Sequence, residues 1–175
     1  TNCRAPVTPG CTSSTFRAQT PAPTSTSSRD VAAAQSARTA TDRLLYGLSL
    51  GKGGAQLLEE LNADREVYHL NEAHGLPAAF HLLKKYNGNM RKVREKMVFT
   101  THTPEEAGNE KHPLRLCHEM SYFSGLEVDQ VKELMGSSDD VFDHSLCALK
   151  MSRIANGVSQ LHGEVAREMW SKYSG

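Results

Sequence analysis

The sequence lacks the features that several protein classes require. Its four cysteines, Cys3, Cys11, Cys117 and Cys147, form no CxxC pair and are few for 175 residues. This argues against a disulfide framework and favours free thiols in a reducing compartment, so we expect a cytoplasmic protein. No apolar run approaches the roughly 20 residues that a membrane-spanning helix needs.

The chain also has no excess of charge of either sign. Lys and Arg together number 20, and Asp and Glu together also number 20. Such a balance provides no net field toward nucleic acid or an anionic membrane surface, and we expect neither as a partner. With 38% hydrophobic and 23% charged residues, the composition is typical of one soluble globular domain.

Residues 1–41 differ in composition from the rest of the chain. About two-thirds of them are Ser, Thr, Pro or Ala, and Asp30 is the single acidic residue. Such a segment cannot bury enough apolar surface to offset the entropy of ordering it. The sequence therefore predicts a low-complexity, largely disordered tract over 1–41 and a folded domain over 42–175.

The folded part begins with leucines at helical spacing from Asp42 to Asn62, interrupted by the glycine cluster Gly51–Gly54. A phosphate-binding loop would need a preceding strand and a Ser or Thr after a Gly-Lys pair, and neither is present. We instead expect the glycines to let this helix approach a neighbour closely.

After residue 64 the pattern alternates between strands and helices, which predicts an α/β fold built on a parallel sheet. A last helix carries the apolar stripe Leu161, Val165 and Met169. The predicted strands are Val67–Leu70, Met97–Thr101 and Gly157–Ser159, and the other predicted helices are Pro77–Tyr86, Val128–Met135 and Val141–Ile154.

Polar side chains follow each predicted strand. Because parallel strands joined by helices place their carboxyl ends at one edge of the sheet, these side chains should cluster there. Amides, carboxylates and imidazoles without a basic cluster suit a neutral ligand with many hydroxyls, such as a sugar. The residues are Asn71, Glu72, His74, His102, Thr103, Ser159 and His162, with Asn156 just before the third strand.

A metal site is the alternative that eight histidines suggest. The spacing disfavours it, because His69 and His74 are five residues apart, no HExxH motif occurs, and neither Cys117 nor Cys147 has a partner at ligand spacing. The remaining histidines are expected to be solvated or satisfied locally, without a function. They are His81, His112, His118 and His144.

Three longer motifs resemble a known family. HLNEAHG (His69 to Gly75), VFTTHTPEEAGNE (Val98 to Glu110) and RIANGVSQLHGEVAREMW (Arg153 to Trp170) resemble the α-glucan phosphorylases, the glycogen, starch and maltodextrin phosphorylase group, and above all its shorter bacterial branch. The similarity covers about residues 42–172. It implies a partial Rossmann-like sheet from the N-terminal half of a glycosyltransferase with two Rossmann-like domains.

The resemblance implies phosphorolysis of terminal α-1,4-glucosyl units of a glucan by inorganic phosphate. Glucose 1-phosphate is the product, and a pyridoxal phosphate cofactor assists with its own phosphate group. In that scheme His102 positions the reacting glucosyl unit, and Asn156 and His162 belong to a motif placed loosely near the cleft. The implied substrate-binding residues are Asn71, Glu72, His74, Thr103, Glu106 and Ala107.

The sequence departs from the family in three respects. Ala73 stands where the bacterial branch usually has Gly, and Glu72 is longer than the Asp of the animal enzymes. The cofactor lysine and the phosphate-binding Lys and Arg belong to the family's C-terminal half, which this chain does not match. We therefore expect a fragment that lacks its C-terminal half, holds no cofactor of its own and does not catalyse the reaction alone. A non-catalytic module that binds glucan or protein is the alternative.

Overall fold

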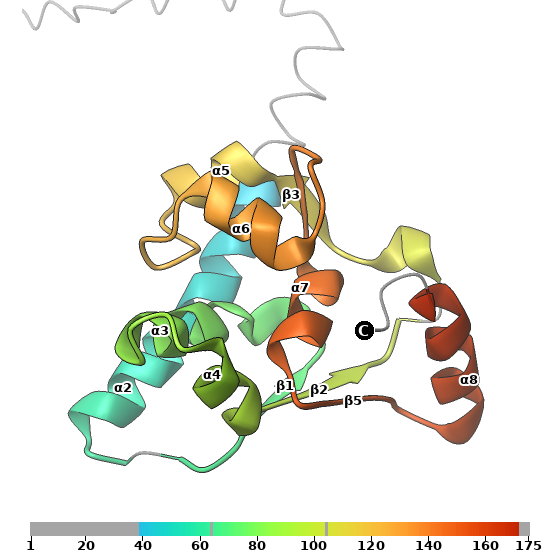
Figure 1. The fold of residues 1–175 in the computed structure, drawn as a ribbon, viewed down its shortest axis with the longest axis horizontal. Coiled ribbons are helices and arrows are strands. Elements are labelled where there is room, and N and C mark those ends of the chain that lie inside the picture. The colour runs from blue at the N-terminus through green and yellow to red at the C-terminus, as the bar shows by residue number, and fades with distance from the viewer. Residues whose placement is uncertain (1–38, 64, 104, 172–175) are drawn as a thin grey trace, which may run out of the picture.

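The computed structural model describes residues 39–171 except residues 64 and 104 (Figure 1). Residues 39–47 are helical, and the helix continues through a π-helical segment, η1 (Leu48–Gly53), into α2 (Gly54–Glu60). The helix expected up to Asn62 is confirmed. Residues 39–41, which their composition assigned to the disordered tract, are helical, and this helix packs on the core through Leu44. The remainder of that tract, residues 1–38, lies outside the described residues.

The glycine cluster allows a close helix contact, as expected. A Cβ atom on Gly51 would lie 2.5 Å from the carbonyl oxygen of Gly75 and 2.9 Å from the backbone nitrogen of Ala78. Any side chain at this position would therefore collide with backbone. Gly54, by contrast, has open space around it, so the requirement for glycine lies at Gly51.

Three parallel strands form the main sheet, in the order β1 (Tyr68–Asn71), β2 (Met97–Thr101), β5 (Ile154–Gly157). Asn71 pairs with Thr100, and Thr100 pairs with Asn156. The α/β class and the parallel sheet are confirmed, and the first two strands lie within one residue of their expected positions. The third lies earlier than the expected Gly157–Ser159, because Ser159 instead caps the next helix, accepting from the His162 N–H at 3.2 Å.

The crossover between β1 and β2 contains the 3₁₀ turn η2 (Ala73–Gly75) and the helices α3 (Pro77–Lys85) and α4 (Met90–Lys96). The helix expected at Pro77 is confirmed. Sequence reasoning missed α4, because Val93 is its one buried residue and gives no apolar stripe. Asn89 starts this helix by accepting a hydrogen bond from the Lys92 N–H at 3.1 Å.

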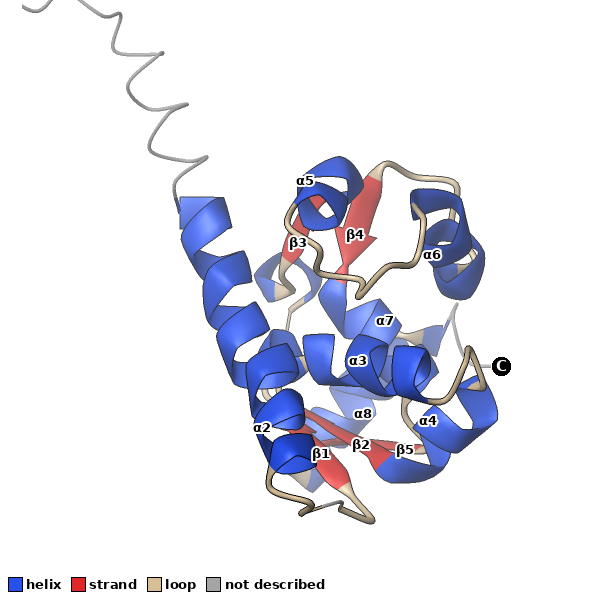
Figure 2. Cartoon of the chain, turned by 90° about the vertical axis from the view of Figure 1, so that its left-hand side faces the viewer, coloured by secondary structure: helices blue, strands red, loops and turns tan. Residues whose placement is uncertain are grey.

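The connection from β2 to β5 contains a small antiparallel pair of strands that lies apart from the main sheet, with α5 and α6 beside it (Figure 2). The helix expected over Val141–Ile154 is wrong at both ends, because Asp143 caps a shorter helix by accepting from the Leu146 N–H at 2.9 Å. The elements in order are η3 (Glu106–Gly108), β3 (Lys111–Pro113), α5 (Leu114–Glu119), α6 (Val128–Met135), β4 (Val141–Asp143) and α7 (His144–Met151).

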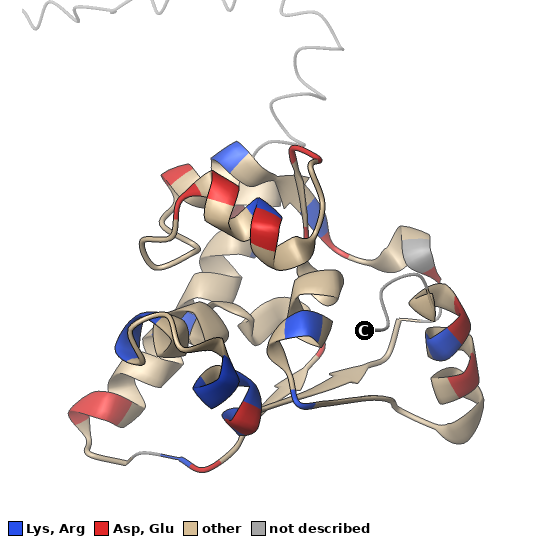
Figure 3. Ribbon diagram, viewed as in Figure 1, with Lys and Arg blue, Asp and Glu red and all other residues tan. Residues whose placement is uncertain are grey.

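Helices α3, α4 and α7 cover one face of the main sheet, whose strands carry no Lys, Arg, Asp or Glu (Figure 3). Leu70, Met97 and Phe99 point from the strands into this core. An aromatic cluster extends it, with the ring centroids of Phe80 and Phe123 5.2 Å apart. Burial of such apolar surface is the main stabilising contribution, at about 25 cal/mol per Å².

The last helix, α8 (Gln160–Met169), contacts β5. Its expected apolar stripe does not face the core, since Leu161 is 72% exposed and Val165 is also exposed. Within the described part of the chain, no helix combines the length and apolar character needed to cross a membrane.

Candidate functional site

The carboxyl ends of β1 and β2 meet through Glu72, which follows β1 directly. Its Oε1 atom accepts hydrogen bonds from the backbone N–H of His102 and from the hydroxyl of Thr103, the latter at 3.1 Å. The two turns are 30 residues apart in sequence and adjoin because the strands are parallel neighbours. The structure thus brings Glu72, His102 and Thr103 together, as the strand order implied.

The backbone of Glu72 is strained. Its φ of 62° and ψ of 173° place it in a region that is almost restricted to glycine, at a cost of roughly 1–3 kcal/mol. Its N–H donates to the Thr100 carbonyl at 2.9 Å, and its carboxylate holds the next turn, so the surrounding structure enforces this conformation. Strain that is maintained in this way is concentrated at functional sites.

Several polar groups at or beside this turn are free to bind a ligand. The side chains of Asn71 and His102 are exposed and make no hydrogen bond to any residue that the structure describes. The Oε2 atom of Glu72 is likewise without such a bond. The amide and the imidazole can each donate to and accept from hydroxyl groups, and the carboxylate oxygen can accept from them. The sequence led us to expect groups of this kind at this edge.

The loop after His102 contributes a shallow depression of about 640 Å³. It is lined by Ala107 of η3, by the residues that follow it, among them Asn109 and Glu110, and by Arg43 from the first helix. Ala107 is exposed, while Glu106, the other residue expected here, lies in the same short turn.

His74 lies in η2 with its side chain half exposed, and it contacts two residues that sequence reasoning gave no role. Its Nδ1 atom is 3.5 Å from Oε2 of Glu110, and its ring meets the ring of Tyr46 edge to face, with centroids 6.2 Å apart. Glu110 is the last residue of the second family motif, and this was the signal in the sequence that it could have a role. Its nearness to His74 depends on the fold.

Two histidines that were expected to be solvated or locally satisfied are instead buried together. His112 Nδ1 and His144 Nε2 are 2.9 Å apart, and the Tyr122 hydroxyl is 3.0 Å from His144 Nδ1. Burial lowers the pKa of His144 well below its usual value, and it lowers the pKa of His112 against an opposing effect of Glu110. The expectation fails because β3 and α7 place the two rings face to edge inside the core. His81 and His118, by contrast, are at least partly exposed and pair with Glu59 and Glu127.

A second row of polar side chains crosses the main sheet. The Thr100 hydroxyl donates to Asn156 Oδ1 at 3.1 Å and lies 2.8 Å from Nε2 of His69. Because that hydroxyl proton is already used, His69 presents its Nε2–H to Thr100. Asn156 therefore joins β5 to β2. His162 is buried, and its Nε2 atom has no partner among the described residues.

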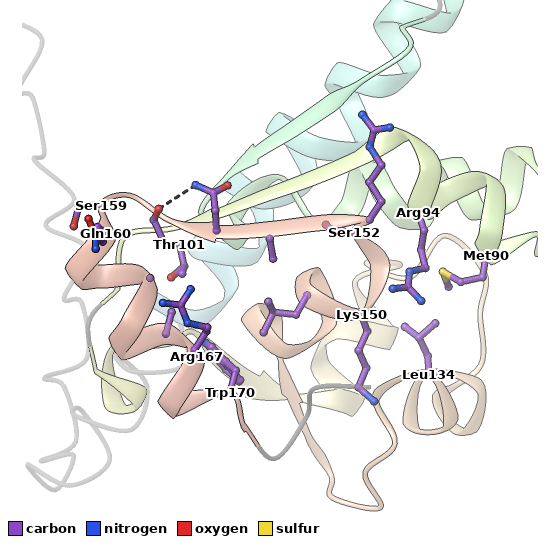
Figure 4. A pocket seen from close by; sticks show the side chains of 17 residues that line it. Met90, Arg94, Thr101, Leu134, Lys150, Ser152, Ser159, Gln160, Arg167 and Trp170 are labelled. Carbon is purple, nitrogen blue, oxygen red and sulfur yellow. Dashed lines mark hydrogen bonds between the residues drawn. The ribbon is translucent and has the colours of Figure 1, made fainter.

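A larger cleft, of about 910 Å³, lies elsewhere, between β5, α7 and α8 (Figure 4). It shares Asn156 and Ser159 with the expected site, but Glu72, His74 and His102 do not line it. Its lining contains four cationic side chains and no acidic one; they are Arg94, Lys150, Arg153 and Arg167.

No group of three or more His, Cys, Asp or Glu side chains in the described ranges is arranged to hold a metal ion. Cys117 and Cys147 are buried free thiols, and burial raises the pKa of Cys117 to about 12.

Comparison with known proteins relates this chain to a family, although no protein-family model matches it. An uncharacterized protein of Methanocaldococcus jannaschii is 38% identical over 122 residues, which is 70% of this chain and 22% of that protein. The maltodextrin phosphorylase of Thermococcus litoralis is 35% identical over 137 residues, or 73% of this chain and 16% of the enzyme. The glycogen phosphorylase of Aquifex aeolicus is 33% identical over 143 residues, or 74% of this chain and 21% of the enzyme. The chain is related to a segment of the α-glucan phosphorylases.

The resemblance drawn from the three motifs is thereby confirmed. This phosphorylase-like segment spans about a fifth of the length of the curated relatives that it matches. Two of those relatives are named for phosphorylase activity on maltodextrin and glycogen.

Proposed function

We propose that this chain is the sugar-binding segment of an α-glucan phosphorylase, an enzyme that transfers a terminal α-1,4-glucosyl unit to inorganic phosphate and releases glucose 1-phosphate. The observation that carries the proposal is the Glu72 carboxylate, which is anchored through one oxygen to the 102–103 turn and leaves the other oxygen unengaged. The sheet and its helices belong, in this proposal, to the first of two Rossmann-like domains.

The roles of the individual residues follow from their contacts. His102 orients the reacting glucosyl unit through its exposed imidazole, and Asn71 and the free oxygen of Glu72 bind hydroxyls of an adjoining sugar. Thr103 acts through Glu72, because its own hydroxyl proton is donated to that carboxylate. Ala107 and Glu106 border the sugar path. None of these groups needs to transfer a proton.

Pyridoxal phosphate, which the family implies, would supply a phosphate group that assists the attack of inorganic phosphate. The described residues do not fit it. A lysine that forms a Schiff base needs a desolvated amine with a lowered pKa, and each described lysine side chain is at least partly exposed. We therefore place the cofactor site outside this segment and assign the chain a role in binding only.

Maltoheptaose titrated into the isotopically labelled chain tests the proposal by backbone amide NMR. Shifts are expected at residues 71–74 and 102–103. Glu72→Gln should weaken binding about tenfold to a hundredfold, because a hydrogen bond to a charged group contributes about 1.5–3 kcal/mol.

Two controls make this measurement specific. Glu119→Gln alters an exposed carboxylate on α5 that pairs with Arg115, and it should bind as the wild type does. Cellohexaose, a β-linked glucan, should leave the same amides unshifted. Maltoheptaose shifts that are confined to the cleft between β5 and α8 would refute the assignment.

A further inference from the structure

A continuous row of polar side chains leads from the candidate sugar site into the core. His74 contacts Glu110, whose other carboxylate oxygen is 3.6 Å from His112 Nε2. His112 contacts His144, and His144 contacts Tyr122. The members come from η2, the residue before β3, β3 itself, α7 and the turn after α5, so the row ties five parts of the chain together.

The protons along this row can be placed from the chemistry of its ends. A carboxylate attracts an N–H and repels a lone pair, so the ring nitrogens of His74 and His112 that lie 3.5 and 3.6 Å from Glu110 favour the N–H form. Tyr122 is buried, and burial raises the pKa of its hydroxyl well above the usual value, so it remains a neutral O–H group.

The two histidines between these ends are neutral, since burial lowers the pKa of both. Each therefore has one N–H and one lone pair. With Nε2–H of His112 toward Glu110, its Nδ1 atom accepts from Nε2–H of His144. His144 Nδ1 then accepts from the Tyr122 hydroxyl.

The reverse arrangement conflicts with Glu110. If His144 donated to Tyr122 and His112 donated to His144, the lone pair of His112 Nε2 would face the carboxylate. Two electron-rich groups would then oppose each other in a partly buried place, where charge interactions are strong. Arg43, the other charged group near His112, also lowers the pKa of that ring and so helps to keep it neutral.

The same reasoning applies to His74 on the outer side of Glu110. The second carboxylate oxygen faces His74 Nδ1, which therefore carries the N–H in the neutral ring. His74 Nε2 is left as a lone pair that can only accept a hydrogen bond.

We propose that Glu110, held from inside by His112, His144 and Tyr122, is a positioning residue that fixes the tautomer of His74 with Nε2 as the acceptor for a ligand hydroxyl. The device selects a group that donates, such as a sugar O–H, over one that can only accept. Naming that hydroxyl as part of a glucan rests on the proposed function, whereas the tautomer itself does not.

Long-range ¹H–¹⁵N correlation spectra of the histidine rings, recorded above the titration range of imidazole, test the proton arrangement. In the wild-type chain we expect the Nδ1–H form for His74 and the Nε2–H form for His112 and His144. Glu110→Gln should convert His74 into a mixture of tautomers, and Glu119→Gln should leave it unchanged. A purely structural role for Glu110 would alter the melting temperature without altering the tautomer.

The outcomes separate the two proposals. The Nε2–H form of His74 in the wild-type chain would overturn this inference, even if Glu110→Gln failed to fold. Maltoheptaose should bind Glu110→Gln about tenfold more weakly, and equal affinity of the two proteins would also overturn it. If neither protein bound the glucan, the proposed function would fail, and the tautomer spectra alone would decide the role of Glu110.

Discussion

Replacing Glu72 by glycine and by alanine separates its strained backbone from its hydrogen bonds. Both substitutions remove the carboxylate that accepts from the His102 N–H and the Thr103 hydroxyl. Alanine must still adopt a φ of 62°, whereas glycine adopts it without a steric penalty. The difference in stability between the two variants therefore reports the strain, offset by the greater entropy that glycine loses on folding.

The expected difference has an unusual sign. At an ordinary position alanine is more stable than glycine by about 0.4–1 kcal/mol, because glycine loses more entropy on folding. The backbone strain at Glu72 is roughly 1–3 kcal/mol. We expect Glu72→Gly to have a free energy of unfolding about 1 kcal/mol higher than that of Glu72→Ala, with both below the wild type.

Urea unfolding of the 175-residue chain, followed by far-ultraviolet circular dichroism, measures this difference as a shift of the midpoint at constant slope. Glu95, exposed inside α4, provides the matched control, because Glu95→Gly should be less stable than Glu95→Ala by about 1 kcal/mol. If Glu72→Ala proved as stable as Glu72→Gly, the strain argument would be refuted, and with it one support for the functional importance of this turn.

Three further outcomes can be checked on the same chain. Gly51→Ala should lower the free energy of unfolding by about 1–3 kcal/mol, because its Cβ would meet the Gly75 carbonyl at 2.5 Å. Gly54→Ala is the control, since Gly54 has open space and its replacement should not be destabilising. Equal melting temperatures of the two variants would contradict the prediction. The free energy of unfolding should fall as the pH drops below about 6.5, since burial lowers the pKa of His144 below that value and the unfolded chain then binds more protons than the folded one. The urea midpoints at pH 7.5 and pH 5.5 should therefore differ less in His144→Gln than in the wild type. An equal difference in the two proteins would contradict the argument. With Cys3 and Cys11 replaced by Ser, Cys117 and Cys147 should react with a thiol reagent only after unfolding, because both are buried; rapid labelling of the folded chain would disprove their burial.

Within the unit from Tyr68 to Thr101, the local pattern of the sequence predicted both strands and α3, but it did not predict α4. Two runs of β-forming residues flank a helix that begins at Pro77, and the parallel arrangement that such a unit adopts explains why Glu72 meets the turn at His102 and Thr103. The close approach at Gly51 could also be expected, since a glycine cluster inside a helix otherwise only destabilises it.

Other features were decided by contacts between distant segments. Val141–Asp143 begins a segment whose apolar spacing predicts a helix, yet these residues form a strand because they pair with Lys111–Pro113, 28 to 32 residues earlier. Leu161 and Val165 have helical spacing but do not face the described core. A periodic pattern specifies which face of an element is apolar, but not which neighbour covers it.

The row from His74 to Tyr122 depended on tertiary structure altogether. His144 lies 22 residues from Tyr122 and 32 from His112, and a lone histidine in sequence carries no mark of its partner. The charge of Glu110 acts strongly on the protons of His112 and His144 because the core excludes the water that would otherwise exchange hydrogen bonds with these two rings. The sequence supplies the ionisable groups, while their burial and their directed hydrogen bonds exist only once the chain is folded.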